Sequence, residues 1–283
     1  MNLTLEILKA ILLGIVQGIT EWLPISSTGH MILVDEFIKM QFPAEFVDLF
    51  LVVVQFGSIL AVVLLYFHKL NPFSRRKSAT EKANTFELWS KVLVACVPAG
   101  IIGVLFNDTI KELFFNSTVV AITLHITPDW LLIYEVDGDG FILIENQKKV
   151  SVTNSLNAIT YKEALLIGVF QVLALIPGTS RSGATILGGI MLGLSRTVAS
   201  EFTFFVAIPV MFGASLLDIV KYSGSFTFAQ VLVLLVGMVT AFLVSVAAIR
   251  ALMKYIRKHD FKIFGYYRIV LGVLVLLYFA FVR

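Results

Sequence analysis

The sequence predicts an all-α, polytopic membrane protein, and its composition, its long apolar runs and an internal repeat are the three observations behind this fold class. Of the 283 residues, 58% are hydrophobic and only 14% are charged, against about 25% charged residues in an ordinary soluble domain. A globular core cannot hold that much apolar surface, so we expect a lipid bilayer to be the main solvent. The net charge of +3 is too small to indicate a nucleic-acid partner. With Cys96 as the only cysteine, a disulfide framework is excluded.

Apolar runs of membrane-spanning length recur along the chain. The long runs cover residues 47–67, 92–106, 202–220, 228–253 and 264–282, and each can cross a bilayer or nearly so, because about 20 residues are needed. Shorter runs at 5–23, 164–176 and 184–194 are interrupted by Pro24, Pro177, Gly178 and Gly183. These interruptions predict broken helices rather than simple spans.

The charges of the loops predict the topology. Loop 69–91 carries Arg75, Arg76, Lys77 and Lys82, and segment 254–262 is also basic, so both should be cytoplasmic by the positive-inside rule. Segment 35–48 is acidic and fits the outside. These placements require the segment before residue 47 to enter and leave on the outer face, and segment 161–200 to enter and leave on the cytoplasmic face. We therefore expect two re-entrant segments, one from each side.

The two re-entrant segments resemble each other. At an offset of 154 residues, GIVQ at 14–17 matches GVFQ at 168–171, and SSTG at 26–29 matches SRSG at 180–183. At an offset of 156, EF at 45–46 matches EF at 201–202, and FG at 56–57 matches FG at 212–213. We expect one membrane domain over 1–283, with repeat one at about 1–116 and repeat two at about 160–283. Opposite orientation makes them inverted-topology repeats, whose broken helices meet near the bilayer midplane; chance similarity of apolar helices is the alternative.

The first broken segment reads QGITEWLPISSTGH over residues 17–30. Gln17 and Glu21 are four residues apart and share one face of a helix. Ser26, Ser27 and Thr28 open the next helix, whose N-terminus is a natural anion site.

The second broken segment reads PGTSRSGAT over residues 177–185. Arg181 lies among hydroxyls and glycines just before a helix, which suits a phosphate held by two-pronged, charge-assisted hydrogen bonds. The flanking groups expected to bind the same anion are those of Thr179, Ser180, Ser182 and Gly183. Two structural alternatives stay open: Glu21 and Arg181 could pair only to hold the repeats together, and the serines could bond back to helix carbonyls.

Both motifs, in this order, resemble those of the undecaprenyl pyrophosphate phosphatase family, also called UppP or BacA. The likeness covers the whole chain except about residues 124–140. It implies hydrolysis of undecaprenyl pyrophosphate to the monophosphate and inorganic phosphate, which recycles the lipid carrier for peptidoglycan synthesis and lowers sensitivity to bacitracin. It also implies a multi-pass protein of the bacterial plasma membrane, an outward-facing reaction site and a divalent cation, Mg²⁺ or Ca²⁺. The expected partners are the polyprenyl pyrophosphate and membrane lipids, with a homodimer left open.

The resemblance also implies roles for single residues. Glu21 would be a cation ligand or an acid–base group, with Gln17 as its helper. Ser27 and His30 would supply nucleophile and general base, and Arg181 would clamp the pyrophosphate. The residues themselves agree with these roles, because phosphoryl transfer mostly needs positioning and charge neutralisation. They leave open whether Ser27, His30 or a water molecule attacks.

Residues 125–140 do not fit a membrane helix. Pro128 breaks a helix, and four acidic residues in this segment are costly in lipid. Locally, 131–145 predicts a β-hairpin, and residues 125–143 resemble a fragment of YafQ-type toxins. Some twenty residues are too few for that domain, so we expect a replaced segment and no nuclease activity.

Two other functions compete with phosphate hydrolysis. A secondary transporter or lipid flippase also uses inverted repeats with broken helices at the midplane. A membrane phosphatase of the acid-phosphatase type would need a histidine soon after its late Ser-Arg pair, but Ser195-Arg196 is followed by no histidine before His259.

Overall fold

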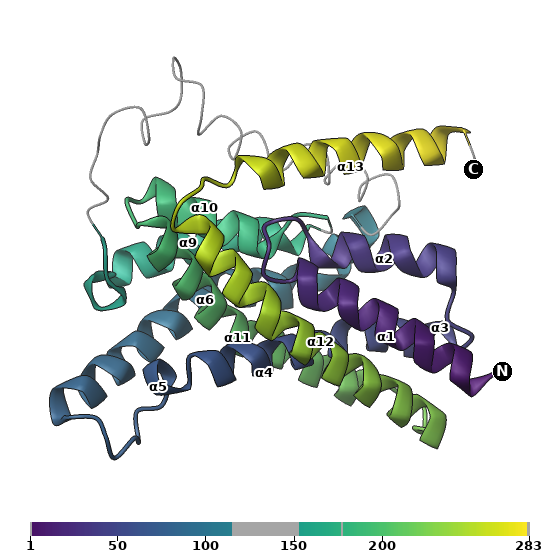
Figure 1. The fold of residues 1–283 in the computed structure, drawn as a ribbon, viewed down its shortest axis with the longest axis horizontal. Helices are drawn as coiled ribbons and strands as arrows, with labels where there is room; N and C mark the ends of the chain where they lie inside the picture. The colour runs from purple at the N-terminus through teal and green to yellow at the C-terminus, as the bar shows by residue number, and fades with distance from the viewer. Residues whose placement is uncertain (1, 115–152, 177, 282–283) are drawn as a thin grey trace.

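A computed structural model describes residues 2–114, 153–176 and 178–281, and within these ranges the chain is helical, without a β-strand. Figure 1 shows the helices packed around one another, with the last one lying across one side. The anomalous segment 125–140, its predicted hairpin and Pro177 lie outside the described residues. The helices are α1 (Leu3–Thr20), α2 (Ser27–Ile38), α3 (Ala44–Val53), α4 (Gln55–Leu65), α5 (Phe67–Leu70), α6 (Ala79–Phe114), η1 (Leu156–Ala158), α9 (Tyr161–Val172), η2 (Leu173–Leu175), α10 (Arg181–Met191), α11 (Arg196–Lys221), α12 (Phe228–Ile256) and α13 (Lys262–Phe281).

Five of the described helical stretches are long and apolar enough to cross a membrane. They are Leu3–Thr20, Ala44–Leu65, Ala79–Phe106, Arg196–Lys221 and Phe228–Ile256. The all-α, polytopic fold class predicted from the sequence is therefore confirmed. Two details differ from the apolar runs. Helix α1 is by itself long enough to span a membrane, and α6 begins 13 residues before the run at 92–106 because polar helix formers extend it.

Small residues allow the long helices to approach closely. A Cβ added to Gly14 of α1 would lie 2.7 Å from the carbonyl oxygen of Gly237 in α12, and one added to Gly18 would lie 2.8 Å from that of Ala241. In the other half, a Cβ on Gly168 of α9 would meet the carbonyl oxygen of Ala95 in α6. Glycines at such contacts let backbones pack closely in lipid, where van der Waals contact drives helix association.

This packing is reciprocal between the two halves of the chain. The first helix of the N-terminal half packs on α12 of the C-terminal half, and α9 packs on α6 of the N-terminal half. Each half thus packs against a helix of the other. The opposite membrane orientation of the two halves stays a prediction.

Each sequence motif forms a turn between two helices. After α1, residues 21–25 form a turn that contains Pro24, and α2 starts behind Ser26, whose φ of 69° lies in the left-handed region that non-glycine residues rarely occupy. After α9 and η2, Gly178 has a φ of 89°, and α10 starts behind Ser180. The predicted helix breaks therefore exist, and they bring two helix N-termini into the interior.

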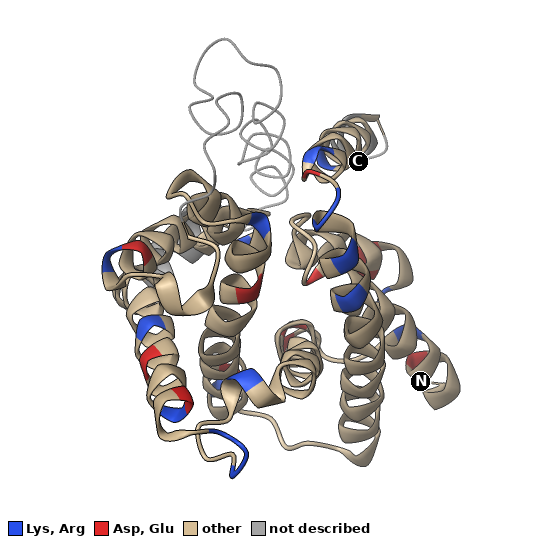
Figure 2. Ribbon diagram, turned by 60° about the vertical axis from the view of Figure 1, so that its left-hand side comes forward, with Lys and Arg blue, Asp and Glu red and all other residues tan. Residues whose placement is uncertain are grey.

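Charged residues are sparse along the helices and gather near their ends. In Figure 2 the loop between α5 and α6 is blue with Lys and Arg at the bottom of the view, while much of the ribbon above it is tan. This distribution fits the basic loop predicted from the sequence, whose cytoplasmic placement stays a prediction.

Candidate active site

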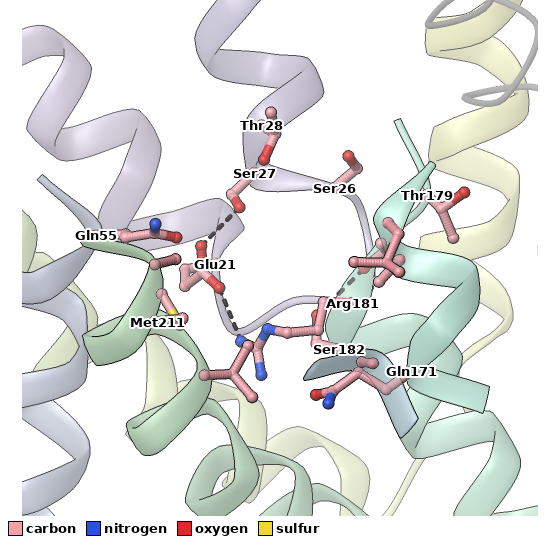
Figure 3. A pocket seen from close by; sticks show the side chains of 16 residues that line it. Glu21, Ser26, Ser27, Thr28, Gln55, Gln171, Thr179, Arg181, Ser182 and Met211 are labelled. Carbon is pink, nitrogen blue, oxygen red and sulfur yellow. Dashed lines mark hydrogen bonds and ion pairs between the residues drawn. The ribbon is translucent and has the colours of Figure 1, made fainter. Parts of the chain in front are cut away.

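The two motif turns line one cavity of about 180 Å³. Figure 3 shows Glu21, Ser27 and Arg181 pointing toward one another in it. The polar wall is formed by Glu21, Ser26, Ser27, Thr28, Gln55, Gln171, Thr179, Ser180, Arg181 and Ser182, and the remainder of the wall by Ala99, Ala174, Leu175, Val210, Met211 and Ala214. The cavity therefore combines polar groups suited to an anion with apolar groups suited to hydrocarbon.

Glu21 is the centre of the polar wall. Its Oε1 accepts a hydrogen bond from Nη2 of Arg181 at 2.8 Å, which also forms an ion pair between the two motifs. Its Oε2 accepts from the Ser27 hydroxyl at 2.6 Å and from the Gln17 amide at 2.7 Å. The side chains of Glu21 and Arg181 are 5% and 14% exposed. The carboxylate is thus held by three donors from both halves of the chain.

The hydroxyls of Ser26 and Ser180 cap the two helices that start at the cavity. Ser180 Oγ accepts from the Gly183 N–H at 3.0 Å, and Ser26 Oγ accepts from the Gly29 N–H at 3.4 Å. The partial positive charge of both helix N-termini therefore faces the cavity, which favours an anion. Ser182 instead donates to the Leu23 carbonyl at 3.0 Å and joins the turns.

Three predicted site residues do not line the cavity. Gln17 and Gly183 contact residues that do, since Gln17 donates to Glu21 and the Gly183 N–H donates to Ser180. The third is His30. It lies one turn into α2, with Nδ1 2.7 Å from the Ser26 carbonyl oxygen and Nε2 2.7 Å from the Tyr267 hydroxyl. Its ring stacks on Tyr267 at a centroid distance of 5.6 Å. Both ring nitrogens are engaged away from Glu21, so its role as general base stays a prediction.

Two glutamines belong to the cavity although no motif marked them as site residues. Gln171 is the repeat counterpart of Gln17, a signal that could have identified it. Within the described part of the chain its buried Oε1 has no hydrogen-bond partner, and neither does the buried hydroxyl of Thr179. Gln55 lies inside an uninterrupted apolar run, where the sequence gives no local sign of a site.

The donors fit a divalent cation only if the ligand supplies further oxygens. Among the described residues, no group of three or more His, Cys, Asp and Glu side chains could hold a metal. Glu21 is the carboxylate of the cavity wall, and the hydroxyl of Ser27 lies beside it. One carboxylate together with substrate phosphates is a common way to hold Mg²⁺.

The chain is similar to known proteins over nearly its whole length. The family model described as bacitracin resistance protein BacA matches residues 10–274. The undecaprenyl-diphosphatase of Desulfitobacterium hafniense is 58% identical over 278 residues, 97% of this chain and 96% of that protein. Undecaprenyl-diphosphatase 1 of Clostridioides difficile is 58% identical over 275 residues, 97% of each chain. The undecaprenyl-diphosphatase of Acetivibrio thermocellus is 57% identical over 281 residues, covering 99% of this chain and 100% of that one. This chain therefore belongs to the bacitracin resistance protein BacA family.

Proposed function

We propose that this protein is an undecaprenyl-diphosphatase, which hydrolyses undecaprenyl pyrophosphate to undecaprenyl phosphate and inorganic phosphate and so recycles the lipid carrier of cell-wall synthesis. The observation that carries the proposal is the Glu21–Arg181 pair beside the Ser27 hydroxyl, in a cavity lined by both polar and apolar side chains. A lipid diphosphate needs both kinds of group, the polar ones for its phosphates and the apolar ones for its first isoprene units.

The cavity residues divide the work of phosphoryl transfer. Arg181 donates to the non-bridging oxygens and neutralises the charge that develops on them. The N–H groups at the starts of α2 and α10 add positive potential from two directions. The buried hydroxyl of Thr179 and the amide of Gln171 are further groups available to the diphosphate.

The attacking oxygen lies on the side of Glu21. A proton leaves the Ser27 hydroxyl, or a water molecule in its place, toward Glu21 Oε2 at 2.6 Å. The oxygen then forms a bond to the terminal phosphorus, the bond from that phosphorus to the bridging oxygen breaks, and undecaprenyl phosphate leaves. If Ser27 is the nucleophile, water hydrolyses the phosphoserine in a second step.

A divalent cation, Mg²⁺ or Ca²⁺, would be held by Glu21 together with the two phosphates, and when bound it supplies neutralisation of negative charge. This assignment offers a reason for a carboxylate in an anion site, since Glu21 alone would repel the substrate. We also propose that the protein lies in the bacterial plasma membrane and that the cavity receives its substrate from the outer face. The acidic segment 35–48 and the basic loop 69–91 support that orientation.

The test is phosphate release from undecaprenyl pyrophosphate by the purified protein in detergent, compared between wild type and Arg181→Lys. The lysine keeps the charge and loses the planar fork, so we expect turnover to fall by about 100-fold, the effect of losing one preorganised donor to a developing anion. Arg196→Lys, outside the cavity, is the matched control and should leave turnover unchanged. A transporter or flippase would release no phosphate in this assay, and near-normal turnover of Arg181→Lys would refute the clamp.

A further inference from the structure

A second cavity lies far from the candidate active site. It measures about 720 Å³ and is formed by the loop after α5, the first turns of α6, the segment 154–157 and the first turns of α11. Along α11, Glu201 is the last residue that lines this cavity and Val210 is the first that lines the other. Nine residues separate them, which is about 14 Å along a helix. The two cavities are therefore separate sites.

The wall of the second cavity carries more positive than negative groups. Lys69, Arg76 and Lys77 line it together with His68, against the carboxylates of Glu81 and Glu201. Both carboxylates are already engaged. Glu201 pairs with Lys69 at 2.6 Å, and Glu81 accepts the Ser78 N–H at 2.7 Å at the start of α6.

Two cations of this wall form no ion pair with a carboxylate among the described residues. The Lys77 ammonium donates only to neutral oxygens, the Thr85 hydroxyl at 2.7 Å and the Lys69 carbonyl at 3.1 Å, which fix it at the cavity. Arg76 is exposed and forms no ion pair within the described part of the chain. The N-termini of α6 and α11 also begin at this cavity and add positive potential. These features together fit a phosphate oxyanion.

The surroundings of the cavity favour a phosphate that is attached to lipid. Phe73, on the same loop, is 79% exposed, and its ring packs edge-to-face against that of Phe86, which is 53% exposed, at 5.9 Å. Exposed aromatic rings beside basic side chains are typical of the headgroup level of a bilayer. The loop is also predicted to be cytoplasmic, where the leaflet carries anionic lipids.

We infer that this cavity, centred on Arg76 and Lys77, binds the phosphate of an anionic phospholipid headgroup at the cytoplasmic end of the protein. Phe73 and Phe86 lie beside the headgroup, at the level where its acyl chains begin. This lipid site lies outside the catalytic cavity and does not depend on the reaction proposed there.

The experiment uses the full-length protein and counts bound lipids by native mass spectrometry, with phosphatidylglycerol titrated against phosphatidylcholine. The cavity variant is Arg76→Gln/Lys77→Gln. Its matched control is Arg75→Gln/Lys82→Gln, which removes the same charge from the same region but from residues that do not line the cavity. We expect the cavity variant to bind phosphatidylglycerol about 30-fold more weakly, because two cations near an anionic headgroup are lost, and the control to change by less than about threefold.

A second arm offers inorganic phosphate to the protein in lipid-free detergent. We expect no phosphate binding that depends on Arg76 and Lys77 at millimolar concentration, because the lipid proposal needs the anchored headgroup. If both double variants lost phosphatidylglycerol binding equally, the binding would depend only on general surface charge, and the proposal would be overturned. Phosphate binding that the cavity variant abolishes, without preference for phosphatidylglycerol, would overturn the lipid assignment. Phosphate release from undecaprenyl pyrophosphate should be the same in all forms, which separates this site from the proposed reaction.

Discussion

Replacing Glu21 and Arg181 singly and together separates a structural ion pair from a catalytic one. Their charged atoms are 2.8 Å apart, and the side chains are 5% and 14% exposed. Removing one partner of a buried pair leaves an uncompensated charge and costs about 3–5 kcal/mol. Since Arg181 keeps some exposure, we expect Glu21→Gln and Arg181→Gln each to lower the free energy of unfolding by about 3 kcal/mol, near the lower end of that range.

The double variant Glu21→Gln/Arg181→Gln leaves no buried charge, so most of that loss should be recovered. Its activity should not recover. An arginine that neutralises a phosphoryl-transfer transition state contributes about 10³-fold or more, and the double variant lacks that arginine and the proton acceptor. The two readouts are denaturant titration in detergent micelles and phosphate release from undecaprenyl pyrophosphate. If the double variant were stable and within tenfold of wild-type turnover, the pair would only hold the two motifs together, and the proposed chemistry would be refuted.

Three further predictions test the fold, the cation and the topology. Gly57→Ala should destabilise the protein by at least about 1–3 kcal/mol, the usual cost of overpacking, because the new Cβ meets the backbone of α12. At the repeat counterpart, Gly213→Ala, the new Cβ has open space, so this variant should be neutral or stabilising in the same denaturant titration. Equal effects of the two variants would contradict the packing. EDTA should abolish phosphate release and added Mg²⁺ or Ca²⁺ restore it, and full activity in EDTA would exclude the cation. In a Cys96→Ala background, a cysteine at Lys39 should react with a membrane-impermeant thiol reagent in intact cells and one at Ser78 only after lysis; the reverse pattern would invert the topology.

The sequence predicted the broken helices because proline and glycine mark them locally. It predicted their convergence because an internal repeat relates the two motifs. Pro24 and Gly178 stand in the turns that follow the first helix of each motif, where proline and glycine are favoured, whereas Gly183 lies within α10. The 154-residue offset links Ser27 to Arg181 before any contact is known. The structure places these two residues on one cavity wall, each close to Glu21.

The remaining features depend on contacts that no local pattern encodes. His30 bonds to Tyr267, which is 237 residues away, so its direction away from Glu21 could not be read from its neighbours in the motif. Gln55 reaches the cavity because α4 packs beside α11, although it stands in an apolar run. The division between α3 and α4 at Val54 has no proline or glycine at that position to indicate it.

The Glu21–Arg181 pair explains how a site for a diphosphate can exist in an apolar interior before the substrate arrives. An isolated Arg181 at membrane depth would be unfavourable by about 2.5–3.5 kcal/mol, and Glu21 supplies the opposite charge at 2.8 Å. A bound diphosphate competes with Glu21 for the guanidinium, because it offers more negative charge and a geometry that suits two prongs. Glu21 then keeps the hydrogen bonds from Ser27 and Gln17, at 2.6 and 2.7 Å, but faces an anion. A divalent cation would supply the positive charge needed between this carboxylate and the phosphates, which is the physical reason to expect that hydrolysis depends on such a cation.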